Sequence, residues 1–325
     1  MKNQLTYMVL GAGGTGGPIG AFLARAGRDV TLIARGRHLE AMRSGGLKIE
    51  FQDERETVPV KAASMEEYQG TPDVIFVCVK GYSLDEAASF IRRTAGTDTI
   101  VIPILNIYGT GGMLQDMLPE LTVTDGCIYI AAQIKEPGTI LMSGRIFRVV
   151  YGLRKGTPGE VEERAMPVLK KVEEDLKEAG IIPVLSPCIE RDALQKFSFV
   201  SPMAAVEACF DVTAASMQKG GEKRELFSAL VREIAKIASA MGAALPEDIV
   251  EINLKIMDDL APTATASMQR DIASGKPSEV EGLIYQVERL GEKYQVDVPA
   301  YREIGSRLRE KLGGEPRGGL GENRG

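Results

Sequence analysis

Val9-Leu10-Gly11-Ala12-Gly13-Gly14-Thr15-Gly16 is the most informative segment of this 325-residue chain for its fold. It follows an apolar run that predicts a strand over 5–10, and it opens a predicted helix over 15–26, which is the context that a Gly-x-Gly-x-x-Gly motif needs. The three glycines permit a tight turn, a close approach of the backbone to a pyrophosphate, and close packing of helix on strand. Unpaired N–H groups at the start of the helix favour phosphate. We therefore predict a dinucleotide site over residues 11–16, the alternative being a structural turn in a chain with 36 glycines.

The end of the second predicted strand, over 30–34, bears on the choice of dinucleotide. Its last residues lead into Arg35-Gly36-Arg37. Enzymes that prefer NAD usually carry a carboxylate at this point, where it binds the ribose 2′-hydroxyl. A guanidinium pairs instead with a 2′-phosphate. The sequence predicts NADP, with Arg35 or Arg37 as the phosphate ligand; the alternative is an arginine exposed to solvent in a loop.

Strand and helix patterns alternate through the first half of the chain. Alternation of this kind predicts an α/β fold, a Rossmann-type doubly wound sheet. Short β runs after residue 125 are expected to form antiparallel strands that extend this sheet. The predicted strands lie at 47–51, 57–60, 73–79, 99–105, 128–134, 139–142, 148–151 and 182–185, and the predicted helices at 39–42, 84–93 and 160–179.

Strand patterns are absent from the sequence after Pro187, so an all-helical C-terminal domain is expected. We predict a Rossmann NADP-binding domain over 1–186, a helical substrate and dimerisation domain over 187–312, and a disordered tail over 313–325, which is rich in glycine and polar residues. The predicted helices lie at 190–210, 222–241, 246–260, 265–273, 278–294 and 299–312.

Composition excludes several classes of function. A formal net charge of −6 argues against a nucleic-acid or anionic-membrane partner. The 4 cysteines have no Cys-x-x-Cys spacing and only 1 histidine is present, so neither a zinc site nor a histidine-based triad is expected. No apolar run approaches the roughly 18 residues of a membrane span. With no secretory signal recognised, we expect a cytoplasmic protein with reduced thiols.

Several segments, in order along nearly the whole chain, resemble the ketopantoate reductase family (2-dehydropantoate 2-reductases). The glycine turn and LIARGRHLEAMRSGGL at 32–47 are similar to its N-terminal region. VCVKGYSL, ILNIYG and RDALQKF are similar to segments that carry Lys80, Asn106 and Lys196. SMQRDIASGKPSEVEGL is similar to the segment that carries Ser267 and Glu279.

The resemblance implies NADPH-dependent reduction of a 2-keto acid to the 2-hydroxy acid, as in pantothenate biosynthesis. Hydride transfer to a carbonyl places negative charge on its oxygen, so the site must supply a proton. The resemblance gives that role to Lys196, whose apolar neighbours would bury it in part and lower its pKa. Glu279 is then the second catalytic residue, Ser267 and Asn106 bind substrate, and Lys80 and Asn106 join the turn in binding the cofactor.

Each of these residues also has a structural interpretation. Lys196 can be a surface lysine whose stem covers apolar neighbours. Glu279 can be a carboxylate favoured at a helix N-terminus, and Ser267 a helix cap. Asn106 and Lys80 can serve loop and turn geometry alone.

The polar pocket of the family is not preserved. Where the family typically has asparagines, this chain has Val200, Ala204 and Ala264. The family's Asn-Gly after the glutamate is Ile284-Tyr285 here, and its Asn-Gly loop is Asn106-Ile107-Tyr108-Gly109. The substrate is therefore ketopantoate or a related 2-keto acid, and because each lost polar contact is worth about 1 kcal/mol and helps set specificity, our hypothesis favours a bulkier or more apolar acid than ketopantoate.

Two other functions fit the sequence. One is another two-domain NADP dehydrogenase, opine or 6-phosphogluconate-like. The other is a non-catalytic sensor that binds NADP and has lost turnover, as the altered pocket suggests. Since helical C-terminal domains often dimerise, we also expect a homodimer.

Overall fold

The computed structural model describes residues 4–313. Contacts divide the chain into two compact units: a first unit of Met1–Leu105 with Gly109–Glu190, and a second unit of Asn106–Tyr108 with Arg191–Gly325. The C-terminal tail predicted to be disordered lies, apart from Gly313, outside the described residues.

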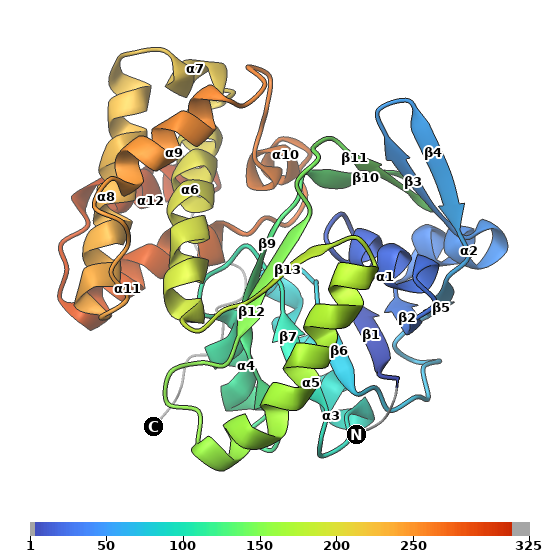
Figure 1. The fold of residues 1–325 in the computed structure, drawn as a ribbon. Helices are drawn as coiled ribbons and strands as arrows, with labels where there is room; N and C mark the ends of the chain where they lie inside the picture. The colour runs from blue at the N-terminus through green and yellow to red at the C-terminus, as the bar shows by residue number, and fades with distance from the viewer. Residues whose placement is uncertain (1–3, 314–325) are drawn as a thin grey trace. The chain divides into compact units, whose positions relative to one another are not determined.

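A six-stranded sheet, parallel at every neighbouring pair, forms the centre of the first unit (Figure 1). Because β1 lies between β2 and β6, the direction of winding reverses between β1 and β6, which confirms the predicted doubly wound sheet. Ligands of such sheets bind at the carboxyl ends of the strands beside the reversal. In spatial order the strands are β5 (Lys61–Ala63), β2 (Asp29–Ile33), β1 (Thr6–Leu10), β6 (Val74–Val77), β7 (Ile100–Pro103) and β8 (Thr122–Val123).

The helices of the first unit follow its strands along the chain. α1 packs on β1 and β2, where a Cβ on Gly20 would lie 2.6 Å from Leu32, so only a glycine allows this approach. α4 was not predicted, because its Thr-Gly-Gly start has low helix propensity. The helices are α1 (Gly16–Arg25), α2 (Gly36–Gly45), α3 (Leu84–Thr94), α4 (Thr110–Met117) and α5 (Gly159–Glu178), with a 3₁₀ turn, η1 (Gly81–Ser83).

Two smaller sheets correct one expectation. The β runs after residue 125 do not extend the six-stranded sheet: the run predicted at 128–134 is two strands, β9 (Asp125–Tyr129) and β10 (Ala132–Glu136), which join different sheets. Alternating side chains predict that a segment is a strand, but its partner is chosen by contacts distant in sequence. The sheets are β10-β11-β3-β4, with β11 (Thr139–Met142), β3 (Leu47–Phe51) and β4 (Glu54–Val58), and β13-β12-β9, with β13 (Ile182–Leu185) and β12 (Arg148–Gly152).

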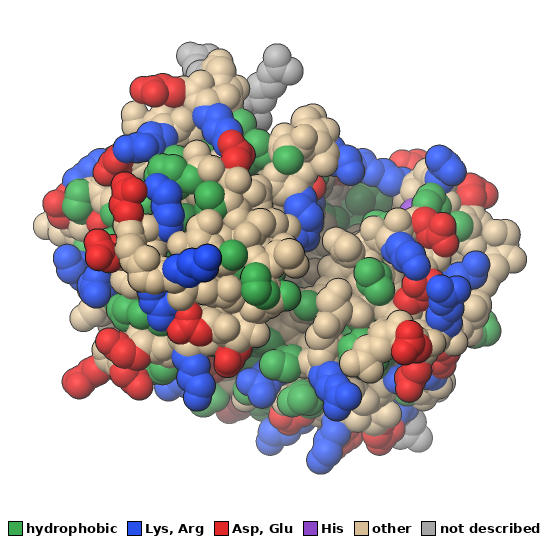
Figure 2. Space-filling view, turned by 90° about the horizontal axis from the view of Figure 1, so that it is seen from above, with side chains coloured by type: hydrophobic (Ala, Val, Ile, Leu, Met, Phe, Trp, Pro, Cys, Tyr) green, Lys and Arg blue, Asp and Glu red, His purple; other side chains and the backbone are tan. Residues whose placement is uncertain are grey.

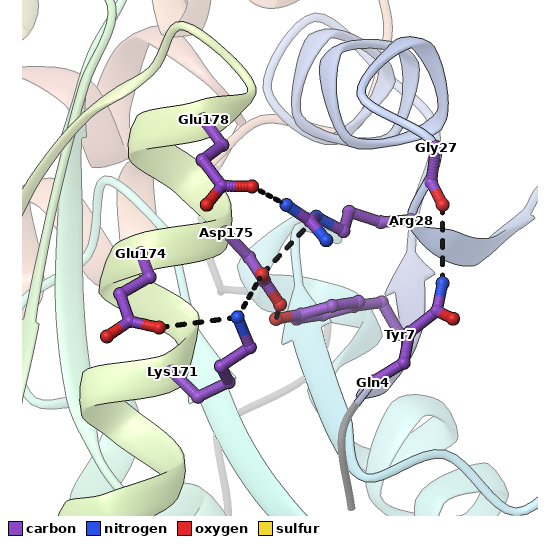
Figure 3. A network of polar contacts seen from close by, with 8 residues as sticks. All are labelled: Gln4, Tyr7, Gly27, Arg28, Lys171, Glu174, Asp175 and Glu178. Carbon is purple, nitrogen blue, oxygen red and sulfur yellow. Dashed lines mark hydrogen bonds and ion pairs between the residues drawn. The ribbon is translucent and has the colours of Figure 1, made fainter.

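A polar network joins α5 to the start of the six-stranded sheet (Figure 3). The Asp175 side chain is 1% exposed and lies between two cations, Arg28 at 3.3 Å and Lys171 at 3.1 Å. Tyr7 in β1 donates a hydrogen bond of 2.5 Å to the same carboxylate. A buried carboxylate is tolerated only when it is paired in this way. The network therefore fixes α5 against β1 and the loop before β2.

The second unit is helical, and no strand follows β13 among residues 4–313, as predicted. Its predicted helix over 278–294 begins differently from expectation, with a π-helical turn, η2 (Glu281–Tyr285). The Ser201 hydroxyl, from a neighbouring helix, donates a 2.6 Å hydrogen bond to the Leu283 carbonyl oxygen in this π-helical turn. A side chain inserted in this way is a known cause of helix irregularity. The helices are α6 (Ile189–Phe210), α7 (Ala215–Gln218), α8 (Glu222–Ala240), α9 (Ile249–Asp258), α10 (Ser267–Ala273), α11 (Gln286–Tyr294) and α12 (Pro299–Lys311).

Charged side chains of both signs cover the surface. On the face drawn in Figure 2, Lys and Arg alternate with Asp and Glu, and no broad patch of one sign is seen.

Candidate functional site

The glycine turn between β1 and α1 has the geometry that its spacing predicts. Gly11 has a φ of +101°, and a Cβ there would lie 2.9 Å from the Cys78 carbonyl oxygen. At Gly16 a Cβ would lie 2.1 Å from the Gly11 oxygen. The position of Gly13 is open, with no atom within 4 Å of an ideal Cβ. Two glycines thus allow the turn to form, and the third leaves free space beside the backbone.

The first turn of α1 is suited to an anion. Thr15 at its N-cap makes no side-chain hydrogen bond to the helix, and the first turn has no acidic residue. The first N–H groups of a helix lack intrahelical partners, and they carry the positive end of the helix dipole. The turn can therefore receive a phosphate without displacing a protein carboxylate.

The single histidine, His38, makes a hydrogen bond to this turn. The sequence did not indicate this contact. Its Nε2 lies 2.9 Å from the Ala12 carbonyl oxygen, and its Nδ1 accepts a 3.0 Å hydrogen bond from the N–H of Gly138. Since Nδ1 is an acceptor, the proton of the neutral ring is on Nε2, which donates to Ala12. Burial lowers the pKa of His38, which favours this neutral form. The ring therefore connects the turn to the β10–β11 hairpin.

Arg35 and Arg37 lie at the start of α2. Arg35 is its N-cap, both arginines are exposed, and the first turn of α2 has no acidic residue. The positive end of the helix dipole disfavours cations there. Two arginines against this local preference are consistent with recognition of an anion.

Lys80 and Asn106 each follow a parallel strand, but they belong to different units. Lys80 comes after β6, half-buried, at the N-cap of η1. It is near the carboxyl end of the strand that borders the reversal of winding. Asn106 comes after β7, and the short segment Asn106–Tyr108 belongs to the second unit.

This short segment packs against α6 and η2. The Lys196 ammonium donates a 3.1 Å hydrogen bond to Asn106 Oδ1. The rings of Tyr108 and Phe197 lie 6.2 Å apart. Ile107 is 3% exposed and packs directly on Gly282: a Cβ added at Gly282 would lie 2.3 Å from the Ile107 side chain. Two residues that the sequence singled out, Lys196 and Asn106, are thereby brought together.

Glu279 and Ser267 lie in the same unit as Lys196. Glu279 is 5% exposed and comes just before η2, and its carbonyl oxygen accepts a 2.9 Å hydrogen bond from the Leu283 N–H. Ser267 is the half-buried first residue of α10. Their roles toward Lys196 stay predictions.

The residues that stand where the family has asparagines lie in apolar surroundings in the structure. Ala204 is fully buried, and Val200 and Ala264 are half-buried and pack against the core of the second unit. Ile284 is also fully buried, and Tyr285 lies under the Arg309 guanidinium, 4.2 Å from the ring centroid. These side chains serve packing and offer no amide to a substrate.

Within residues 4–313, no group of three or more His, Cys, Asp or Glu side chains could hold a metal ion. In the same range, every helix is too short or too polar to span a bilayer.

Comparison with known proteins matches both parts of the chain. The family model described as "Ketopantoate reductase PanE/ApbA" matches residues 7–156, and "Ketopantoate reductase PanE/ApbA C terminal" matches residues 188–311. The 2-dehydropantoate 2-reductase of Mesorhizobium japonicum is 28% identical over 304 residues, which cover 87% of this chain and 90% of the relative.

Solved structures share the fold over almost their whole length. A PanE/ApbA family ketopantoate reductase from Ralstonia eutropha JMP134 has a TM-score of 0.82 and 25% identity, covering 94% of this chain and 98% of that one. A D-mandelate dehydrogenase, solved with NADH and anilino(oxo)acetate, has a TM-score of 0.83 at 21% identity, with the same coverage. The second likeness is one of fold alone.

Proposed function

Because this chain belongs to the ketopantoate reductase family, and is accordingly an oxidoreductase, we propose that it reduces a 2-keto acid to the 2-hydroxy acid with NADPH. The observation that carries the proposal is the hydrogen bond between Lys196 and Asn106, two residues 90 positions apart in sequence. It gives a half-buried ammonium a defined direction, which a general acid requires.

The first unit would hold the cofactor. Its pyrophosphate would fit the open backbone beside Gly13 and the N-terminus of α1, whose first turn has no acidic residue. Arg35 would pair with the 2′-phosphate, with Arg37 as the other candidate, and Lys80 would contribute a positive charge at the carboxyl edge of the sheet. NADPH supplies the hydride when bound.

The second unit would supply the proton. As the substrate carbonyl carbon gains a hydride, its oxygen gains negative charge and takes a proton from the Lys196 ammonium. Asn106 Oδ1 accepts one of the three ammonium hydrogens, so others remain for the substrate. Glu279 would orient the lysine or the substrate hydroxyl, and Ser267 would bind the substrate carboxylate. The lysine regains its proton from solvent, which balances the reaction.

The substrate would be bulkier or more apolar than ketopantoate. The side chains of Val200, Ala204 and Ala264 cannot make the polar contacts of asparagines, and burying a polar substrate group without a partner costs about 1–3 kcal/mol. The D-mandelate dehydrogenase with the same fold was solved with an aryl-substituted oxo acid analogue. We also propose a homodimer, as described for a ketopantoate reductase from Staphylococcus aureus with this fold.

NADPH oxidation with a panel of 2-keto acids tests both the reaction and the substrate. The panel contains ketopantoate, 2-ketoisovalerate, 2-ketoisocaproate, phenylpyruvate and phenylglyoxylate, with NADH as the cofactor control. We expect the highest kcat/KM with an acid more apolar than ketopantoate. Efficient turnover of ketopantoate would contradict the proposal that the substrate is bulkier or more apolar than ketopantoate. NADPH binding without turnover of any acid would favour the non-catalytic sensor.

Lys196→Ala tests the proton donor. Loss of a general acid typically lowers the rate about 10²–10⁴-fold, and we expect kcat to fall in this range. The Kd for NADPH, measured by titrating its fluorescence, should stay within about twofold, because the lysine acts on the substrate. A variant that retains wild-type kcat would remove Lys196 from the mechanism.

A further inference from the structure

α6 carries a proline in its interior, six residues after Lys196. Pro202 has no N–H, so the carbonyl oxygen of Ser198, four residues earlier, has no helical donor. Ser198 is fully buried, so water cannot supply the missing hydrogen bond. A buried carbonyl left without a donor costs about 1–3 kcal/mol.

A side chain from another helix supplies the missing donor. Asn253 in α9 is 1% exposed, and its Nδ2 donates to the Ser198 carbonyl oxygen over 3.0 Å. The same nitrogen lies 3.0 Å from Ser198 Oγ, and an amide group has two hydrogens for these two acceptors. The Ser198 hydroxyl in turn donates to the Gln195 carbonyl oxygen over 2.7 Å.

These bonds surround the turn of α6 that carries Lys196. Gln195 and Ser198 are the first and last residues of that turn, and both are tied into one chain of hydrogen bonds that begins at Asn253. Without Asn253, the turn would have a free carbonyl on the side where Pro202 already weakens the helix. The direction of the Lys196 side chain depends on this turn, and so does its 3.1 Å contact with Asn106.

We propose that Asn253 is a positioning residue for Lys196, which acts by replacing the backbone N–H that Pro202 lacks. The proposal rests on the proposed function, in which Lys196 is the general acid. Asn253 itself touches neither substrate nor cofactor in this role. A purely structural asparagine would affect the stability of the fold but not the proton transfer.

The structure provides a matched rescue. Asn253→Ala removes the donor, and Pro202→Ala restores the helical N–H that can bond to the same carbonyl oxygen. We expect Asn253→Ala to lower kcat at least tenfold and to shift the kcat–pH profile, at an unchanged Kd for NADPH. Pro202→Ala alone should stay within about twofold of the wild type. The double variant should regain kcat and pH profile to within about threefold, so the two changes are strongly non-additive.

A second measurement needs no turnover. Reductive ¹³C-methylation labels the lysine side chains, and the spectrum of Lys196→Arg assigns the Lys196 signal. We expect this signal to move in Asn253→Ala and to return in the double variant. If it does so in a protein that reduces no 2-keto acid, the positioning role stands and the proposed function fails.

Three results would overturn the inference. In the first, Asn253→Ala lowers the Tm but leaves kcat, its pH profile and the Lys196 signal as in the wild type. In the second, Pro202→Ala fails to restore a lost kcat although the double variant is folded and binds NADPH. In the third, the Lys196 signal does not respond to either change.

Discussion

Arg35 and Arg37 stand where a helix dipole disfavours positive charge, and both are exposed at the start of α2. These two arginines are the reason for proposing that an anionic ligand binds here. The sequence places both arginines directly after a predicted strand, but it predicted a helix only over 39–42. The structure shows that α2 already begins at Gly36, so that Arg35 is its N-cap and Arg37 lies in its first turn.

Arg35→Glu is expected to change the cofactor preference. A carboxylate repels the 2′-phosphate of NADPH but can accept a hydrogen bond from the 2′-hydroxyl of NADH. Loss of a charge-assisted pair worth about 1.5–3 kcal/mol predicts a Kd for NADPH roughly 10–150-fold higher. Fluorescence titration with both cofactors measures this, with Arg37→Glu as the matched variant. If Arg37→Glu has the larger effect, the 2′-phosphate ligand is Arg37.

The β10–β11 hairpin is the element that supports the glycine turn, and it approaches the turn at two points. The backbone of Ala132 lies close to Gly14: a Cβ added at Gly14 would be 2.5 Å from the carbonyl oxygen of Ala132. At the other end of the hairpin, Gly138 holds the His38 ring that donates to Ala12. The hairpin therefore limits the conformations of the glycine turn.

His38→Ala should weaken the binding of NADPH by about 5–12-fold, because the turn loses a hydrogen bond worth about 1–1.5 kcal/mol and becomes more mobile. His38→Gln is the matched variant. Its amide nitrogen can take the place of Nε2 and donate to Ala12, so we expect an affinity within about threefold of the wild type. Equal NADPH affinities for wild type and His38→Ala would show that the ring does not support the site.

At the scale of the whole molecule, a buried carboxylate couples stability to pH. Glu207 in α6 is fully buried, and its carboxylate accepts a hydrogen bond from the Ala266 N–H, next to Ser267. Burial raises the pKa of Glu207 from 4.5 to about 7. The folded state therefore binds a proton that the unfolded state releases between these two values. The stabilisation is fully present below pH 4.5 and is lost as the pH rises through about 7.

Glu207→Gln should remove this dependence, since the amide stays neutral. Relative to the variant, the wild type should lose roughly 2–3 kcal/mol of unfolding free energy between pH 5 and pH 8. Urea unfolding at a series of pH values measures the difference. Glu222→Gln is the control, because that carboxylate of α8 is 87% exposed. Parallel pH curves for wild type and Glu207→Gln would show that Glu207 does not take up a proton on folding.

Features that depend on neighbouring residues could be predicted from the sequence. The Gly11–Gly16 turn, the apolar runs of the parallel strands and the periodic helices of the second unit are local patterns, and they predicted the doubly wound sheet and the helical C-terminal region. The family was predicted from the resemblance of several short segments to known sequences. The residues proposed for the site were also named from sequence, through that resemblance.

The contacts between residues distant in sequence are known only from the folded structure. The partners of β9 and β10, the place of Asn106 in the second unit beside Lys196, and the contacts of His38 and Asn253 all join segments far apart in the chain. A histidine after a strand or an asparagine in a helix has no local pattern that reveals its partner. The physical reason is that a buried donor or acceptor must be satisfied, and which group satisfies it depends on packing between elements.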